Sequence, residues 1–257
     1  MYNMRGVILA GGLGSRMSPF TKTITNKHLA PVYTKDGAKP MIDYPVDTLK
    51  KMGITEILVI TSKDHCGDIV EHLGDGYDRG LNFTYKIQEM CDPSRPLGIA
   101  SALKLAEDFT GDQKFIVILG DNYFESSSIL KDCVSYFQLS NSLKCGLFLK
   151  KTDNWSRFGV AELCQPDERE FIPIKRIVEK PKEYVSDLAV TGMYLYTSDV
   201  YQYLNRLTPS QRGELEISDI NSMYAEKQQI WYTIIPSHWS DMGTPESMLE
   251  VQKFLNE

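Results

Sequence analysis

Residues 7–16 read Val-Ile-Leu-Ala-Gly-Gly-Leu-Gly-Ser-Arg, an apolar run that passes directly into a glycine-rich turn. A short apolar run bounded by a turn is typical of a central strand that is covered on both faces. Open α/β sheets bind ligands beyond the carboxyl ends of such strands. The glycines would let main-chain N–H groups approach an anion closely, and Arg16 could add charged donors for phosphate oxygens. A plain tight turn is the alternative that this stretch alone leaves open.

Two familiar phosphate-binding signatures are missing from this turn. It does not end in the Gly-Lys-Ser/Thr of a P-loop, and Met17 stands where a dinucleotide-binding fingerprint needs its third glycine. An NAD-dependent dehydrogenase would share the alternation of strands and helices described next. The missing third glycine argues against that class of enzyme.

The first half of the chain repeats one pattern, in which an apolar run is followed by a turn and an amphipathic stretch. This pattern is typical of strands that alternate with helices. We predict central strands at Val7–Ala10, Ile57–Thr61 and Phe115–Leu119, a more polar strand at Asn82–Gln88, and helices at Met41–Met52 and Ile99–Phe109. The second half is irregular, with short strands predicted at 159–163, 175–178, 192–196 and 230–235 and helices at 218–228 and 245–255. This order predicts an α/β fold, a Rossmann-like three-layer αβα sandwich with a mixed central sheet and a smaller lobe.

The composition is that of an ordinary globular protein, and 257 residues are enough to bury a substantial core. No linker or repeat marks a boundary, so we predict one domain over 1–257, with a first part to about 125 and a second part over 126–257. The net charge of −6 argues against general binding to nucleic acid or anionic lipid. Five cysteines without a C-x-x-C pair are typical of reduced thiols, and the apolar runs are too short to span a bilayer. We therefore expect a cytoplasmic protein without a membrane partner.

Two aspartates stand out because each is expected at the end of a strand. Asp121 follows the apolar run Phe115–Leu119, and Asp241 lies in Ser-Asp-Met-Gly-Thr near the end of the chain. Carboxylate oxygens suit Mg²⁺, which takes one or two of them together with substrate phosphates. Taken singly, either aspartate could form a turn or cap a helix instead.

Two further segments place charged side chains at predicted turns. Lys27 could neutralise phosphate oxygens if its segment folds back toward the glycine-rich turn. Glu179-Lys180-Pro181 joins a carboxylate to a cation at the end of a strand, which would suit a ligand with both a hydroxyl and a phosphate. A surface lysine and an exposed ion pair are the respective alternatives. His28, considered alone, is more typical of a packed or solvent-facing histidine than of a catalyst.

Taken together and in this order, the segments resemble the sugar nucleotidyltransferase family, most closely its glucose-1-phosphate thymidylyltransferases. The matching segments, spread over nearly the whole chain, are GVILAGGLGSR (6–16), NKHLAP (26–31), KPMIDY (39–44), YKIQ (85–88), LGDN (119–122), RFGVAE (157–162), EKP (179–181), VTGMY (190–194), RGELEISD (212–219) and DMGT (241–244). A single one of these matches would carry little weight, but ten in order are highly specific.

The resemblance implies an enzyme that joins a nucleoside triphosphate, with dTTP favoured, to a hexose-1-phosphate, with glucose-1-phosphate favoured, and releases pyrophosphate with Mg²⁺ as cofactor. It implies a homo-oligomer, catalytic roles for Arg16, Lys27 and Asp121, and metal ligation by Asp121 and Asp241. It implies nucleotide contacts from Leu9, Ala10, Gly11, Gly12, Gly14, Ser15, Arg16, Gln88 and Gly98. It implies a sugar-binding second part, with contacts to the sugar phosphate from Asn122, Gly159, Glu179, Lys180, Thr191 and Arg212.

The chain departs from the thymidylyltransferase pattern near the expected base site. Residues 89–97 form a longer segment than the short base-side loop of that pattern, and Ser101 stands in place of a glutamine. A UTP-dependent uridylyltransferase is therefore the nearest alternative, because a pocket distinguishes one methyl group by only about 1–3 kcal/mol. A non-catalytic sugar-nucleotide-binding protein is the other alternative, and it would be expected to lack Arg16, Lys27 or one of the aspartates. The segment after Asp241 is also shorter than in family members with a second, regulatory nucleotide site.

Overall fold

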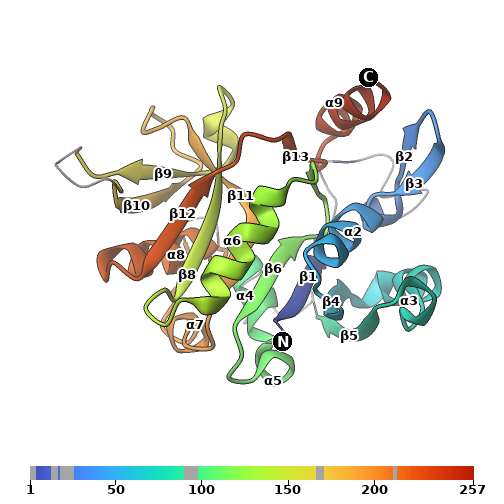
Figure 1. Cartoon of the computed structure of the whole chain (residues 1–257), viewed down its shortest axis with the longest axis horizontal. Helices are drawn as coiled ribbons and strands as arrows, with labels where there is room; N and C mark the ends of the chain where they lie inside the picture. Colours follow the sequence, from blue (N-terminus) through green and yellow to red (C-terminus); the bar gives the residue numbers. More distant parts are fainter. Residues whose placement is uncertain (1–3, 13–16, 18–25, 90–97, 166–170, 211–212) are drawn as a thin grey trace.

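The computed structural model describes residues 4–12, 17, 26–89, 98–165, 171–210 and 213–257 (Figure 1). Within these residues nine strands form one mixed sheet, which confirms the predicted α/β class. The main order is β10-β9-β11-β6-β1-β4-β5, and β8 pairs with both β11 and β12. The strands are β1 (Arg5–Ala10), β4 (Glu56–Ser62), β5 (Asn82–Gln88), β6 (Phe115–Leu119), β8 (Cys145–Lys151), β9 (Gly159–Leu163), β10 (Ile174–Glu179), β11 (Leu188–Tyr196) and β12 (Ile230–Ile234).

The two halves of the sheet differ in strand direction. β1 pairs in parallel with β4 and β6, and β4 pairs in parallel with β5. β11 runs antiparallel to β6 and to β8, and it joins the second half of the chain to the first. The carboxyl ends of β1, β4, β5 and β6 therefore meet along one edge of the sheet, the position at which open α/β sheets bind ligands.

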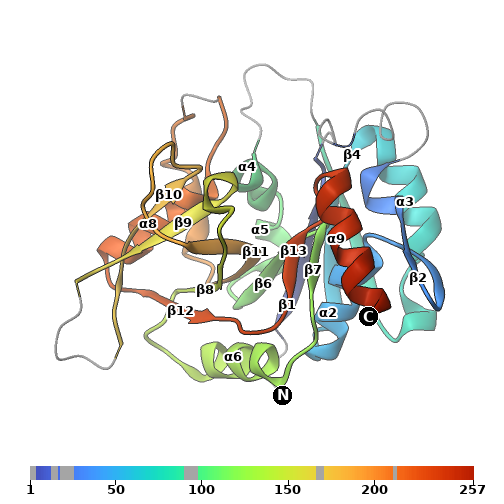
Figure 2. The ribbon, with the colours of Figure 1, turned by 90° about the horizontal axis from the view of Figure 1, so that it is seen from above.

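Helices cover both faces of the sheet (Figure 2). One face packs against α2 (Asp43–Lys51), α3 (Cys66–Leu73) and α6 (Ser128–Leu139), and the other against α4 (Ile99–Lys104), α5 (Glu107–Thr110), α7 (Val200–Leu204) and α8 (Ile217–Glu226). Along β1, Val7 packs in the core with Leu103, whereas Ile8 packs in the opposite core with Val46 and Phe137. This alternation explains why the central strands read as continuous apolar runs, since each fully buried side chain contributes about 1.5–3 kcal/mol.

A third, smaller core lies beside the sheet. It lies among the hairpin β2 (Pro31–Thr34) and β3 (Gly37–Pro40), the two-stranded sheet β7 (Asn122–Phe124) and β13 (Trp239–Asp241), and the last helix α9 (Pro245–Asn256). Its buried members include Met41, Tyr123, Met242 and Val251. Thr244 caps α9 through a reciprocal capping box with Ser247. The strand that ends at Asp241 is therefore followed at once by a firmly started helix.

Several predicted elements differ from those observed. The single helix predicted at Ile99–Phe109 is wrong, because the chain turns between α4 and α5. There the N–H groups of Leu105 and Ala106 donate to carbonyl oxygens three residues back, at 3.0 and 2.9 Å, and this tighter turn ends α4. β5 has the predicted bounds, but Ile87 is exposed and Gln88 is buried at its end. The single-domain boundaries stay a prediction.

Gly192, in β11, should tolerate no side chain. Its N–H donates to the Asn122 side-chain oxygen at 3.1 Å, and an added Cβ would lie 2.4 Å from the same atom. We expect Gly192→Ala to lower the free energy of unfolding by about 1–3 kcal/mol, because Asn122 is buried and held on several sides. Gly67→Ala is the control, since a Cβ there meets nothing within 4 Å and should stabilise α3 by about 0.5–1 kcal/mol. Urea unfolding of both variants tests this, and equal effects would contradict it.

Candidate active site

A cleft opens beyond β6, where the nucleotide-side and sugar-side segments of the resemblance meet. Its described walls come from β6, β7, β9, β10, β11, the amino ends of α4 and α8, β13 and the short helix η5 (Trp155–Arg157). The cleft is bordered by Asp121, Asp241, Glu179, Arg157 and Lys180. It therefore holds charges of both signs, as a site for phosphorylated ligands and a metal ion requires.

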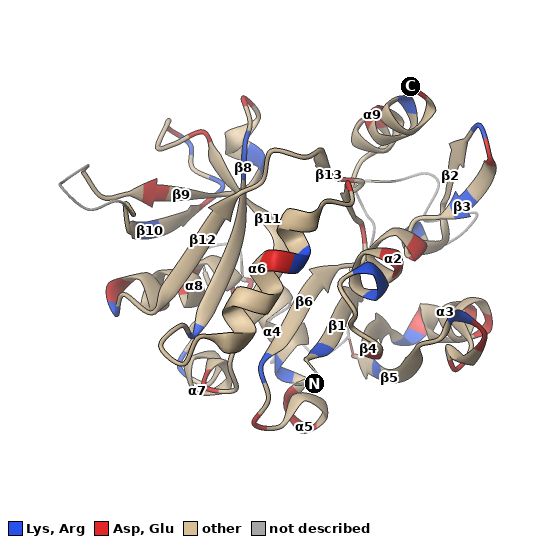
Figure 3. Cartoon of the chain, viewed as in Figure 1, with Lys and Arg blue, Asp and Glu red and all other residues tan. Residues whose placement is uncertain are grey.

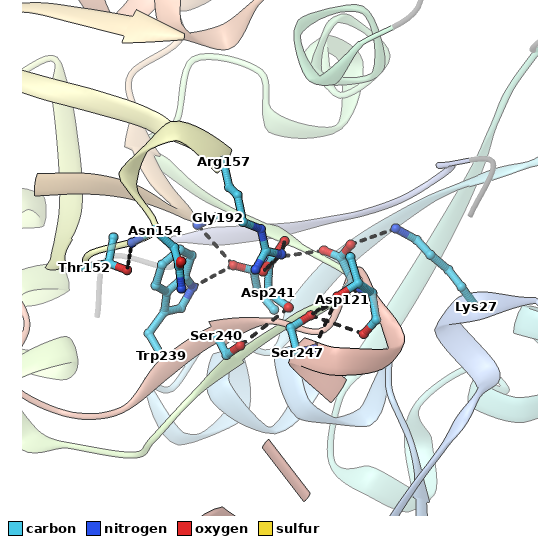
Figure 4. Close-up of polar contacts among 12 residues, drawn as sticks. Lys27, Asp121, Thr152, Asn154, Arg157, Gly192, Trp239, Ser240, Asp241 and Ser247 are labelled. Carbon is cyan, nitrogen blue, oxygen red and sulfur yellow. Dashed lines mark hydrogen bonds and ion pairs between the residues drawn. The ribbon is translucent and has the colours of Figure 1, made fainter. Parts of the chain in front are cut away.

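Asp121 lies directly after β6 and before β7. Its carboxylate accepts a hydrogen bond from the Lys27 ammonium at 2.7 Å and another from the Asn122 side chain at 3.0 Å (Figure 4). The Lys27 and Asp121 side chains are only 11% and 10% exposed. Burial alone would raise the pKa of Asp121, but the Lys27 charge and the two hydrogen bonds hold that pKa well below its usual range. Asp121 is therefore ionised at neutral pH.

Asp241 lies beside Asp121 because β13 pairs with β7. In this antiparallel pair Asp241 is opposite Asn122, and the N–H of Met242 donates to the Asp121 carbonyl oxygen at 2.7 Å. The Asp241 carboxylate accepts from an Arg157 guanidinium nitrogen at 3.1 and 3.4 Å. Figure 4 shows the two aspartates close together, with Lys27 and Arg157 approaching them from different sides. The structure thus brings together the two predicted metal ligands.

On the nucleotide side, the start of the glycine-rich turn is enclosed by two predicted ligand-binding side chains. A Cβ at Gly11 would lie 2.6 Å from the Gln88 side-chain oxygen, and one at Gly12 would lie 3.4 Å from the Lys27 ammonium. The Gln88 amide also donates to the Ser101 hydroxyl at 3.3 Å. Gln88 can therefore approach the backbone this closely only because glycine stands at position 11, whereas a Cβ at position 12 would make ordinary van der Waals contact with Lys27.

The other predicted nucleotide residues fall into two groups. Leu9 and Ala10 are buried within β1, so only their main chain is placed to face a ligand. Gly98, with a φ of +126°, precedes α4 and leaves room for the Leu215 carbonyl oxygen, which a Cβ would approach to 2.6 Å. Gly14, Ser15, Arg16 and, on the sugar side, Arg212 lie outside the described residues.

Three predicted sugar-side residues line the cleft together. The Glu179 carboxylate accepts from the Ser218 hydroxyl at 2.6 Å, and an added Cβ at Gly159 would come within 3.1 Å of the same carboxylate. The Lys180 ammonium lies 3.7 Å from Glu179. Lys180 also has a φ of +39°, a backbone conformation that is uncommon outside glycine and is often found at functional sites.

The side chains of Asn122 and Thr191 make internal contacts, and of the two only Asn122 also lines the described cleft. The Asn122 oxygen accepts from the Gly192 N–H at 3.1 Å and from the Trp239 indole N–H at 2.7 Å. Thr191 is fully buried and donates to the Phe148 carbonyl oxygen at 2.7 Å. Both residues hold strands together in this structure, and their contact with a sugar stays a prediction.

The nucleotidyl transferase family matches residues 5–257. The chain belongs to this family. A low-salt glycan biosynthesis nucleotidyltransferase, Agl11 of Haloferax volcanii, is 37% identical over 99% of this chain and 66% of its own length. A glucose-1-phosphate thymidylyltransferase of Neisseria meningitidis is 38% identical over 98% of this chain and 82% of its own length.

Solved structures share the fold of this nucleotidyl transferase. A Bacillus anthracis protein assigned as a glucose-1-phosphate thymidylyltransferase, in complex with sucrose, superposes with a TM-score of 0.86 at 42% identity, covering 99% of this chain and 96% of that one. A UDP-glucose pyrophosphorylase complexed with UDP-glucose has a TM-score of 0.81 at 24% identity, covering 98% of both chains. The predicted family membership and the mixed central sheet are therefore confirmed.

Sequence reasoning missed two residues of the cleft of this nucleotidyl transferase. Arg157 belongs to one of the matching segments but was given no role, and no local pattern distinguishes it from a surface arginine. Trp239 lies two residues before Asp241 on the same strand and therefore on the same face, but a strand of three residues gives no periodic signal in the sequence. Both contact an aspartate or its neighbour.

The described part of the chain contains no cluster of three or more His, Cys, Asp or Glu side chains suited to a metal ion. A metal at this site would therefore use the two aspartates together with oxygen atoms from a ligand.

None of the described helices has both the length and the apolar character that crossing a membrane requires. Acidic and basic residues are interspersed along the elements of the molecule (Figure 3).

His28 follows Lys27 in the chain and is almost fully buried. Asn26 accepts from its main-chain N–H at 3.0 Å and contacts its ring Nδ1 at 3.1 Å. Burial, followed by the Lys27 charge, lowers the pKa of His28 to about 3. The ring is therefore neutral at physiological pH and contributes structure rather than charge.

The depressed pKa of His28 makes stability depend on pH. Because the unfolded chain takes up this proton near pH 6.5 and the folded chain only near the lowered pKa, the contribution is complete above pH 6.5 and is lost as pH falls toward about 3. We expect the free energy of unfolding to fall by up to about 1.4 kcal/mol per pH unit below 6.5 through this group. Urea unfolding at pH 7, 6, 5 and 4.5 should show a shallower slope for His28→Gln than for the wild type. Equal slopes would contradict the assignment.

Proposed function

We propose that this chain is a sugar-1-phosphate nucleotidyltransferase that condenses dTTP with glucose-1-phosphate, forming the nucleotide sugar and releasing pyrophosphate. The observation that supports this most is the pairing of Asp121 with Asp241 in one cleft. On one side lie Gly11 and Gly12 at the start of the glycine-rich turn, with Lys27 and Gln88, and on the other lie Glu179 and Lys180. The names of the similar proteins from Neisseria and Bacillus agree with this choice of substrates. A cytoplasmic location and a homo-oligomeric assembly stay predictions.

The chemistry of the two aspartates fits Mg²⁺. Both offer hard carboxylate oxygens, Asp241 pairs across β13 and β7 with Asn122, the residue next to Asp121, and Asp121 is ionised. Asp121 and Asp241 would hold the ion, which when bound neutralises negative charge on phosphate oxygens and orients them. Two carboxylates leave the remaining positions of an octahedral ion to water and substrate phosphate, which is the usual arrangement for Mg²⁺ in phosphoryl transfer.

The reaction needs positioning and charge neutralisation more than a base. A sugar phosphate has its second pKa near about 6, so at neutral pH it is already largely a dianion that can attack the α-phosphorus in line. Lys27 and Arg16 would neutralise the departing pyrophosphate, while Lys180 would hold the attacking phosphate. Glu179, already an acceptor for Ser218, would accept from a sugar hydroxyl. His28 is buried and contacts Asn26, and burial lowers its pKa to about 3, so the ring is a weak base at neutral pH.

A UTP-dependent uridylyltransferase is the second candidate. The Gln88 amide offers one donor and one acceptor, which can pair with the edge of thymine or uracil, whereas cytosine presents a different pattern. The described contacts of Gln88 with Ser101 and Gly11 do not distinguish the 5-methyl group. Gln88 in these surroundings can pair with either thymine or uracil.

A substrate panel tests the proposal directly. Pyrophosphate release is measured for dTTP, UTP, dCTP and dATP, each combined with the 1-phosphates of glucose, galactose, mannose and N-acetylglucosamine. We expect the highest kcat/KM with dTTP and glucose-1-phosphate, with UTP lower by about 10- to 200-fold. A preference for UTP would establish the second candidate. Release of pyrophosphate from no combination would refute the enzymatic function.

The role of Asp121 is tested by the variant Asp121→Asn. We expect it to fold, with kcat reduced by about 100-fold or more, because one charged group that organises the reacting phosphates is lost. The control is Asp108→Asn, since this carboxylate is 90% exposed and pairs only with Lys86 among its described contacts; its kcat should be unchanged. A near wild-type rate for Asp121→Asn with Mg²⁺ would count against the proposed site.

A further inference from the structure

Each of the two predicted metal ligands already has a cationic partner from this chain. Lys27 pairs with Asp121 at 2.7 Å, and Arg157 pairs with Asp241 at 3.1 Å. The two cations come from distant segments, η2 (Lys27–Leu29) after the glycine-rich turn and η5 before β9. The metal site of the proposed enzyme is thus built with its own counter-charges in place.

The charges of these four side chains balance. A divalent ion arriving alone would add two positive charges next to two fixed cations, in a region where the carboxylates are only 10% and 14% exposed. Charges that are poorly screened by water repel strongly at such distances. A nucleoside triphosphate instead brings about four negative charges. Its phosphate oxygens can pair with Lys27 and Arg157 when the two carboxylates release these side chains to bind the metal. The balance therefore favours a metal that arrives together with a polyphosphate.

The two ion pairs differ in how easily they can open. Lys27 is 11% exposed, and its partner Asp121 is also held by the adjacent Asn122 amide. Arg157 is 37% exposed at the edge of the cleft, and its bonds to Asp241 are longer. A planar guanidinium binds phosphate oxygens as readily as a carboxylate, so it can exchange one for the other. Arg157 is the cation better placed to move.

We propose that Arg157 is a positioning residue that neutralises Asp241 in the free protein and passes to a phosphate when the triphosphate binds, so that the divalent metal binds tightly only with the nucleotide. The inference rests on the proposed function, because it assumes that Asp241 is a metal ligand. It assigns to Arg157 a role that is distinct from the metal ligands and from the nucleotide contacts of the glycine-rich turn.

Direct metal binding tests this proposal without any measurement of turnover. Mn²⁺ serves as the probe, and its binding is followed by water-proton relaxation, first with protein alone and then with a non-hydrolysable dTTP analogue. Wild-type protein should bind Mn²⁺ weakly alone and at least about 100-fold more tightly with the analogue, a coupling within the range of linked sites. Arg157→Gln should bind Mn²⁺ alone about tenfold more tightly than wild type, because one repelling charge is gone.

Three further variants separate charge from packing. The Arg157 guanidinium carbon lies 5.4 Å from the centre of the Phe158 ring. Arg157→Met removes the charge but keeps a long apolar side chain beside that ring, so it should behave like Arg157→Gln. Arg157→Lys keeps the charge and should bind Mn²⁺ alone as weakly as wild type. Arg176→Gln removes an exposed arginine that pairs with Glu162 outside the cleft and should change nothing.

The outcomes distinguish this inference from the proposed function. If wild-type protein binds Mn²⁺ with the analogue, but Arg157→Gln and Arg157→Met leave the affinity for Mn²⁺ alone unchanged or weaker, the role of Arg157 is wrong while the metal site stands. If wild-type protein shows no enhanced Mn²⁺ binding with the analogue, the metal site itself is wrong, and the proposed function fails with it.

Discussion

The site depends on the buried side chain of Asn122 and the strands that it joins. Its oxygen accepts from the Gly192 N–H of β11 and the Trp239 indole of β13, while its amide donates to Asp121. One side chain thus fixes three segments that are distant in the sequence. A buried amide with these partners satisfied specifies one arrangement, because any shift would leave a polar group unpaired at a cost of about 1–3 kcal/mol. The positions of both aspartates follow from that arrangement.

The ion pairs around this network are better explained by function than by stability. Removing two charges from water costs several kcal/mol, and a buried pair often only recovers that cost. Replacing a buried ion pair by apolar residues of similar volume is often neutral for stability. The proposed site for triphosphate, sugar phosphate and metal needs charges that are in place before the reaction begins, because reorienting them during the reaction would add to the barrier. The cleft retains these charges and compensates each with an opposite one.

The sequence predicted the features that depend on local patterns. The apolar runs at Val7–Ala10 and Phe115–Leu119 form central strands as expected, since both of their faces are covered, and they place Asp121 at a strand end. The sequence could not show that the Asn122 side-chain oxygen accepts hydrogen bonds from Gly192 and Trp239. These residues become its neighbours only in the folded protein. β13 is three residues long, too short for a periodic signal, and its pairing with β7 is defined only by tertiary structure.

The third core connects the last helix of the chain to the segments that carry Asp241 and Lys27. Met242, next to Asp241, is fully buried in the same core as Met17, which follows the glycine-rich turn, and as Val251 of α9. The main-chain oxygen of Tyr33 accepts from Asn256, so α9 also holds the hairpin that follows Lys27. One apolar core therefore supports both the segment that carries Asp241 and the segment that carries Lys27. The helix α9 is not among the elements that line the described cleft. Its packing nevertheless helps to set the distance between the opposite charges of the cleft, because it supports both of these segments.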